Sequence, residues 1–156
     1  MRLVYRVLAY IVAVEVAIQA SMVVWGDAGL GKWIGEGGVL DKSFAENGEA
    51  PFVEFIAFPI HAFNGMIGIP VFALLLLITS FWVRPPGVVK AAAIVVALVA
   101  TQITLGILGH SVPLLGLMHG LNALLLFASA LYAARRAARP AATIPAAAGD
   151  RTVTPV

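Results

Sequence analysis

The chain has 156 residues, of which 61% are hydrophobic and 12% charged, and its mean hydropathy is +0.97. Soluble domains carry about 25% charged residues, so this composition excludes an ordinary soluble domain and predicts an integral membrane protein. The net charge is only +2 and there is no cysteine. These counts do not indicate a nucleic-acid partner, and they exclude a disulfide framework, a thiolate metal site and covalently attached c-type haem.

Four apolar runs predict four transmembrane helices, at about residues 7–25, 55–82, 88–109 and 114–134. Each is long enough for a hydrocarbon core of about 30 Å at about 1.5 Å per residue. The first run follows a short basic start, which is also how a signal peptide begins. We expect the run to stay attached, because it is long and a phrase within it returns in a later run. Pro70, in the middle of the second run, is expected to kink its helix.

Two polar segments complete the chain. Residues 26–54 are rich in glycine and carry six acidic residues against two lysines, so we predict an outer loop there. Residues 140–156 are rich in proline and alanine and are predicted to form a disordered cytoplasmic tail. Residues 1–139 therefore form the single transmembrane domain.

The basic residues predict the orientation of this domain. One side of the predicted helices receives eight of them, namely Arg2, Arg6, Arg84, Lys90, Arg135, Arg136, Arg139 and Arg151. The other side receives only Lys32 and Lys42. Cytoplasmic loops of membrane proteins are enriched in Lys and Arg, so we expect both termini to be cytoplasmic, in the plasma membrane of a bacterium.

A polar phrase that occurs twice lies inside the apolar runs. Its copies are His61-Ala62-Phe63-Asn64-Gly65 and His119-Gly120-Leu121-Asn122-Ala123. An upstream pattern, Val-Ala-x-Gln, also occurs twice and ends at Gln19 in the first run and at Gln102 in the third. We therefore predict an all-α integral membrane four-helix bundle made of two duplicated transmembrane hairpins.

The predicted depths of these polar residues agree. His61 and His119 each lie about 9 to 10 Å inside the outer end of their helices, at about 1.5 Å per residue. Gln19 and Gln102 each lie seven residues before a terminal glycine, which gives a similar depth. The side chains of Asn64 and Asn122 fall one turn deeper on the same helical faces as the histidines. All six side chains therefore form a polar layer near the outer face.

This layer suits haem. Two histidines from facing helices of a four-helix bundle are a known way to bind haem iron on both axial sides. We expect His61 and His119 to ligate haem b, with Gln19, Gln102, Asn64 and Asn122 supplying the hydrogen bonds that orient the imidazoles. Two histidines alone would under-fill the coordination sphere of zinc or copper. His110, at the outer boundary, is a further cofactor-binding candidate or simply an interfacial turn residue.

Three functions remain open. The first is a membrane protein with bis-histidine haem that transfers electrons or handles haem. The second is a haem-modifying enzyme, for which Glu15 and Glu54 are the candidate acids. The third is a non-catalytic accessory subunit of a respiratory or other membrane complex, in which the polar layer only joins helices by hydrogen bonds. Besides the lipid bilayer, the candidate partners are a second copy of the chain and a larger membrane complex.

The segment Gln102-Ile103-Thr104-Leu105-Gly106, followed by a turn and then by His119, resembles the third and fourth helices of a heme A synthase half. Those halves are four-helix bundles with histidines on the second and fourth helices. The resemblance covers all four predicted helices, about half the length of such an enzyme. It implies that His61 and His119 form the axial pair.

The sequence also departs from that family. Phe58 stands where the family has a glutamate three residues before the second-helix histidine, and Ala62 stands where an arginine commonly follows it. The pair of outer-loop cysteines found in many members is absent. The resemblance therefore favours haem binding over the hydroxylation of a haem methyl group.

Overall fold

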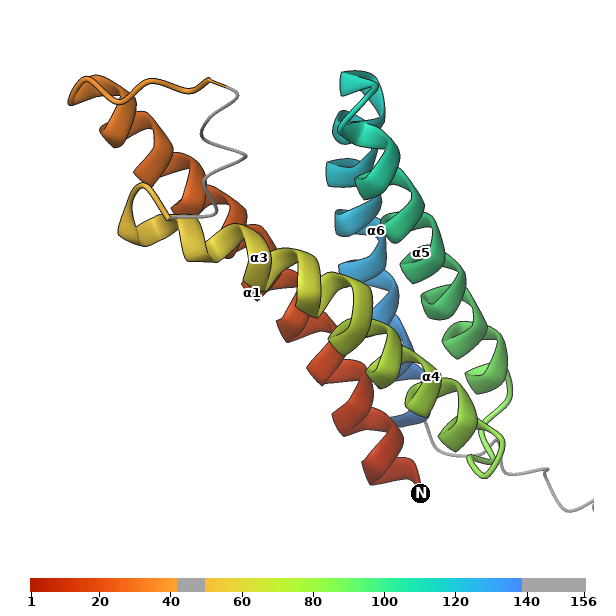
Figure 1. Cartoon of the computed structure of the whole chain (residues 1–156). Helices are drawn as coiled ribbons and strands as arrows, with labels where there is room; N and C mark the ends of the chain where they lie inside the picture. Colours follow the sequence, from red (N-terminus) through yellow and green to blue (C-terminus); the bar gives the residue numbers. More distant parts are fainter. Residues whose placement is uncertain (42–49, 139–156) are drawn as a thin grey trace, which may run out of the picture.

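The computed structural model describes residues 1–41 and 50–138, and every regular element in these two ranges is helical. The predicted disordered tail, residues 140–156, lies outside the described residues. The elements are α1 (Arg2–Gly35), η1 (Val53–Ile56), α3 (Ala57–Phe63), η2 (Asn64–Gly68), α4 (Ile69–Ser80), α5 (Val88–Gly109) and α6 (Pro113–Ala138). Figure 1 shows η1, α3, η2 and α4 following one another as a single bent rod.

Four helical spans are long and apolar enough to cross a membrane, as expected of an integral membrane protein. They are α1, the rod from Val53 to Ser80, α5 and α6. In the bundle, α1 and α5 each pack against both α4 and α6. The second and fourth spans are therefore diagonal to each other across the bundle.

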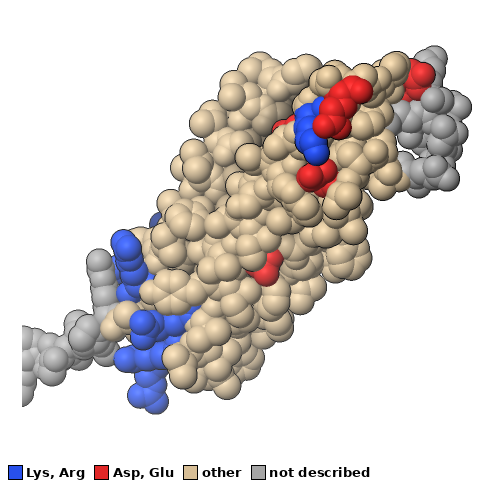
Figure 2. Space-filling view, turned by 90° about the vertical axis from the view of Figure 1, so that its left-hand side faces the viewer, with Lys and Arg blue, Asp and Glu red and all other residues tan. Residues whose placement is uncertain are grey.

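The charged side chains separate along the bundle. Figure 2 shows most of the Lys and Arg side chains gathered at one end and most of the acidic side chains toward the other, with an almost uncharged surface between them. The basic end comprises the start of α1, the α4–α5 turn and the last turn of α6. This distribution is typical of a protein whose apolar midsection lies in lipid.

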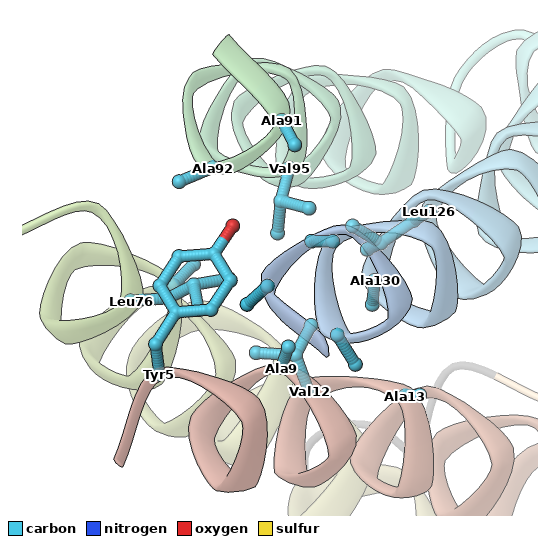
Figure 3. Packing of buried hydrophobic residues seen from close by; sticks show 14 of the residues in the cluster. Tyr5, Ala9, Val12, Ala13, Leu76, Ala91, Ala92, Val95, Leu126 and Ala130 are labelled. Atoms are coloured by element: carbon cyan, nitrogen blue, oxygen red, sulfur yellow. The ribbon is translucent and has the colours of Figure 1, made fainter. Parts of the chain in front are cut away.

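The hydrophobic core lies in the basic half of the bundle. Figure 3 shows its buried side chains, many of them alanines, meeting from all four spans. Small residues allow transmembrane helices to approach closely, since lipid provides no hydrophobic driving force between them. The core also contains the buried Tyr5, whose hydroxyl donates a hydrogen bond to the backbone oxygen of Val88 over 3.1 Å.

The first helix is longer than the sequence predicts. The outer loop was expected to begin at Gly26, but α1 continues to Gly35. Two of the glycines that indicated a loop, Gly26 and Gly29, are instead packing positions. A Cβ added at Gly26 would lie 2.8 Å from the Phe58 ring, and one at Gly29 would overlap Glu54. The predicted loop start is wrong because these glycines let α1 and the start of the second span touch.

The second span contains a π-helical turn, η2, which ends two residues before Pro70. Proline has no N–H and its ring crowds the carbonyl four residues earlier, so the regular α-helical bonding cannot run through it. A π turn with wider hydrogen-bond rings accommodates this, and such turns are frequent at functional sites. The irregularity expected at Pro70 thus takes the form of a π turn, which begins three residues after His61.

Toward the acidic end the two helix pairs separate. Figure 1 shows α1 with α3 leaning away from α5 with α6. From residue 100 to residue 121 no residue is buried. The buried residues that α1 has beyond Gln19 are Gly26 and Gly29, which contact its own partner segment. The layer of polar residues therefore lies where the four-helix core ends.

Candidate functional site

The structure brings the two predicted ligands together. His61 comes from α3 and His119 from α6, and their ring centroids are 6.2 Å apart with an angle of 59° between the rings. Both residues are partly buried. Histidines from diagonal spans, separated by 58 positions in the sequence, thus face each other at the end of the core.

Each imidazole is held by the backbone of the neighbouring helix. The Nδ1 atom of His61 is 3.1 Å from the backbone oxygen of Gln19, and that of His119 is 3.0 Å from the backbone oxygen of Gln102. A carbonyl oxygen only accepts hydrogen bonds, so Nδ1 must carry the hydrogen in both rings. In a neutral imidazole this leaves the lone pair on Nε2, which is the form that binds a metal.

The side-chain amides of these same two glutamines make different contacts. Gln19 Nε2 donates to the backbone oxygen of His61 over 3.0 Å. Gln102 Oε1 instead accepts a hydrogen bond from Asn122 Nδ2 over 2.6 Å, and the same Nδ2 donates to the Leu98 backbone oxygen. Both glutamines therefore lie beside the histidines, but they orient the rings through main-chain oxygens.

Asn64 has a hydrogen-bond partner that the sequence did not predict. Its Nδ2 donates to Glu15 Oε2 over 2.6 Å, so a carboxyl group inside the first span joins the polar layer. Glu15 lies four residues before Gln19 and hence on the same face of α1. This spacing of four residues is the feature of the sequence from which a place for Glu15 in the polar layer could have been predicted.

Glycines make room for the layer. A Cβ added at Gly106 would lie 3.1 Å from His119 Cε1 and 3.2 Å from its Nδ1. A Cβ added at Gly65 would lie 3.1 Å from Gln19 Nε2. The His119 ring and the Gln19 amide therefore rest directly on the backbone of the neighbouring span, a contact that spacing alone did not predict.

Two other candidates lie apart from the histidine pair. His110 caps the end of α5 and is exposed, so the structure does not bring it into the layer. Glu54 lies in η1, where its side chain packs against Gly29 of α1. In the described part of the chain, neither side chain forms a hydrogen bond or ring contact with His61 or His119.

Among the described residues, no group of three or more His, Cys, Asp or Glu side chains lies close enough together to hold a metal ion. Comparison of the chain with protein-family models, curated proteins and solved structures finds no match.

Proposed function

We propose that this chain is a b-type haem protein of the membrane, with His61 and His119 as axial ligands, acting in electron transfer or haem handling. The distance of 6.2 Å between the two ring centroids carries this proposal. Metal–imidazole bonds are about 2.0 to 2.1 Å long in zinc sites, and with iron bonds of similar length two imidazoles on opposite sides of one iron have centroids about 6 Å apart. The observed separation suits an axial pair.

The hydrogen bonds of the rings support the same proposal. Both Nδ1 atoms are engaged by backbone oxygens, which leaves both Nε2 lone pairs available. A second hydrogen bond joins Gln19 and His61: Gln19 Nε2 donates to the His61 backbone oxygen. This bond fixes α3 against α1. In this proposal the chain binds and orients the haem through these groups before any partner is involved.

The small number of metal ligands in the chain and the position of the polar layer also favour haem. Two histidines leave a bare zinc or copper ion short of ligands, whereas a porphyrin supplies four nitrogens of its own. The helix pairs diverge beyond the histidines (Figure 1), and from residue 100 to residue 121 no side chain belongs to a buried core. When bound, haem would supply one-electron redox chemistry at its iron.

We further propose that the bundle consists of two duplicated hairpins and that its basic end is cytoplasmic. In both halves a histidine Nδ1 bonds a glutamine backbone oxygen, and an asparagine lies one turn further along, which supports the duplication. The basic residues at one end support the orientation. With this orientation the histidine layer lies nearer the outer face.

The test is a reduced-minus-oxidised absorption spectrum of the purified chain in detergent, expressed with haem available. We expect a low-spin b-type spectrum in the wild type and its loss in His61→Ala and in His119→Ala. His110→Ala is the matched control, since this exposed histidine lies outside the pair and its loss should leave the spectrum unchanged. Added imidazole should restore the spectrum of His119→Gly by replacing the missing ligand.

A colourless wild type that is stable and correctly folded would sink the haem proposal. The layer would then act only through its hydrogen bonds between helices, as in an accessory subunit. A spectrum that survives both single substitutions would show that haem binds through other groups.

A further inference from the structure

The two halves of the polar layer differ one turn below the histidines. In the α5–α6 half, Asn122 Nδ2 donates to Gln102 Oε1 over 2.6 Å. In the α1–α3 half, Asn64 Nδ2 donates instead to Glu15 Oε2 over 2.6 Å. The residue four positions before the glutamine is Glu15 in one half and Leu98 in the other. The asparagine N–H group therefore bonds Glu15 in the α1–α3 half, whereas in the α5–α6 half it bonds the glutamine side chain.

This difference leaves a buried acceptor without a donor. Gln19 is only 7% exposed, and no donor among the described residues reaches its Oε1. Its amide cannot turn to relieve this, because Nε2 must face the backbone oxygen of His61. Buried side-chain oxygens are rarely left unpartnered, so a donor from outside the chain is the natural complement.

Glu15 provides a second acceptor next to the first. Its hydrogen bond to Asn64 engages one of its two carboxyl oxygens. In the described part of the chain, no Lys or Arg lies within ion-pair distance of it. Glu15 and Gln19 are one turn apart on the same face of α1, with about 6 Å between their Cβ atoms.

We propose that Gln19 Oε1 and the Glu15 carboxyl group bind the hydroxyl groups of a membrane-soluble hydroquinone. The acceptors lie within an apolar span, so their ligand must dissolve in lipid and still carry O–H donors. Two acceptors one turn apart match two hydroxyls on opposite sides of one ring, whereas a simple alcohol satisfies only one of them. Glu15, His61 and Asn64, which surround the Gln19 amide, are partly exposed.

This site consists of protein groups from α1, α3 and η2 alone. Its occupancy can therefore be measured whether or not the purified chain carries haem, and failure of the haem proposal leaves this one standing.

The experiment measures binding of decyl-substituted para-hydroquinone to the full chain in detergent by isothermal titration under reducing conditions. The dimethyl ether of the same compound is the ligand control, because it has the same apolar body and no O–H donor. We expect saturable binding of the hydroquinone and at least about tenfold weaker binding of the ether, corresponding to the loss of one or more hydrogen bonds.

Glu15→Gln is the decisive variant, because it keeps the size of the side chain and introduces an N–H₂ group four residues before Gln19. That group can donate to Gln19 Oε1 and fill the vacant acceptor. We expect about tenfold weaker hydroquinone binding in this variant. Glu15→Leu, which copies the second half, should weaken binding as well. Asp27→Asn, an isosteric change at an exposed acid on the same helix, should leave binding unchanged.

Equal binding of the hydroquinone and its ether to the wild type would overturn the proposal, as would no binding at all. Wild-type affinity in a folded Glu15→Gln variant would also overturn it. In each of these cases a trapped water molecule is the remaining donor for Gln19.

Discussion

Gln19 and His61 hold each other by two hydrogen bonds that run in opposite directions between α1 and α3. Gln19 Nε2 donates to the His61 backbone oxygen over 3.0 Å, and His61 Nδ1 lies 3.1 Å from the Gln19 backbone oxygen. Each bond fixes one residue's side chain against the other's main chain. His119 has only the main-chain half of this arrangement, because the Gln102 side chain bonds Asn122 instead.

The first prediction concerns the support of the His119 ring. Gly106→Ala places a Cβ 3.1 Å from His119 Cε1, so the ring must move and its bond to Gln102 weakens. We expect the variant to bind haem several-fold more weakly, consistent with an overpacking cost of about 1 kcal/mol. The measurement is haem titration followed by absorbance. Gly120→Ala, whose Cβ meets nothing within 4 Å, should bind haem like the wild type.

The second prediction separates bonds between helices from bonds within one helix. Asn122→Leu removes two hydrogen bonds from α6 to α5, and interhelical bonds in membranes contribute about 0.6 to 2 kcal/mol. We expect a loss of stability in that range on unfolding with SDS in mixed micelles. Among the described residues, the partner of the Thr104 hydroxyl is the backbone oxygen of Ala100 in its own helix, so Thr104→Val should be nearly neutral. Equal effects would contradict a role of Asn122 in joining the helices.

The third prediction concerns the outer extension of α1. A Cβ at Gly29 would overlap the Glu54 side chain, so Gly29→Ala should separate η1 from α1. We expect faster hydrogen exchange in residues 52–58, measured by mass spectrometry. Gly31→Ala on the same helix meets nothing within 4 Å in residues 1–41 and 50–138 and should leave exchange there unchanged. Unaltered exchange in both variants would mean that the contact does not hold η1 in place.

The fourth prediction concerns the buried tyrosine at the basic end. Tyr5→Phe deletes the hydrogen bond to the Val88 backbone oxygen and leaves that oxygen without this donor. A typical cost is about 1 kcal/mol, which should appear as a lower midpoint of SDS unfolding. Tyr10 is 42% exposed and has no such bond among those described, so Tyr10→Phe is the matched control. A midpoint equal to that of the control would argue against the Tyr5 bond.

The fifth prediction concerns orientation. The chain has no cysteine, so single cysteines can be introduced without background labelling. With the basic end in the cytoplasm, Ser111→Cys in the α5–α6 turn should react with a membrane-impermeant maleimide on intact cells. Pro86→Cys in the α4–α5 turn should react only after the membrane is opened. The reverse pattern would place the histidine layer toward the cytoplasm.

Much of the fold follows from the apolar runs. The predicted third helix, residues 88–109, agrees with α5, and four spans are present. The fourth helix continues to Ala138, four residues past its predicted end, since Arg135 and Arg136 fit the last turn of a helix. The extension of α1 was missed because glycine is common both in loops and at close contacts between helices, and the sequence alone does not distinguish these two uses. Only the position of Phe58 and Glu54 in space distinguishes the two.

The pairing of His61 with His119 was predictable, because the repeated phrases fixed both depth and face. The hydrogen bonds to the rings were not, since a backbone oxygen carries no residue-specific signal. The pairing of Asn64 with Glu15 was also missed. It depends on the rotation of α3 relative to α1, and periodicity within one helix does not determine that rotation.

The π turn at residues 64–68 sets the rotational phase between the two ends of the second span. Each residue turns an α-helix by about 100°, so deleting one residue from this turn would rotate α3 relative to α4 by about that angle. Because α4 is held in the core, this rotation would turn the His61 side chain away from His119. Length changes in this short stretch are therefore expected to abolish the histidine pair even when every polar residue of the layer is retained.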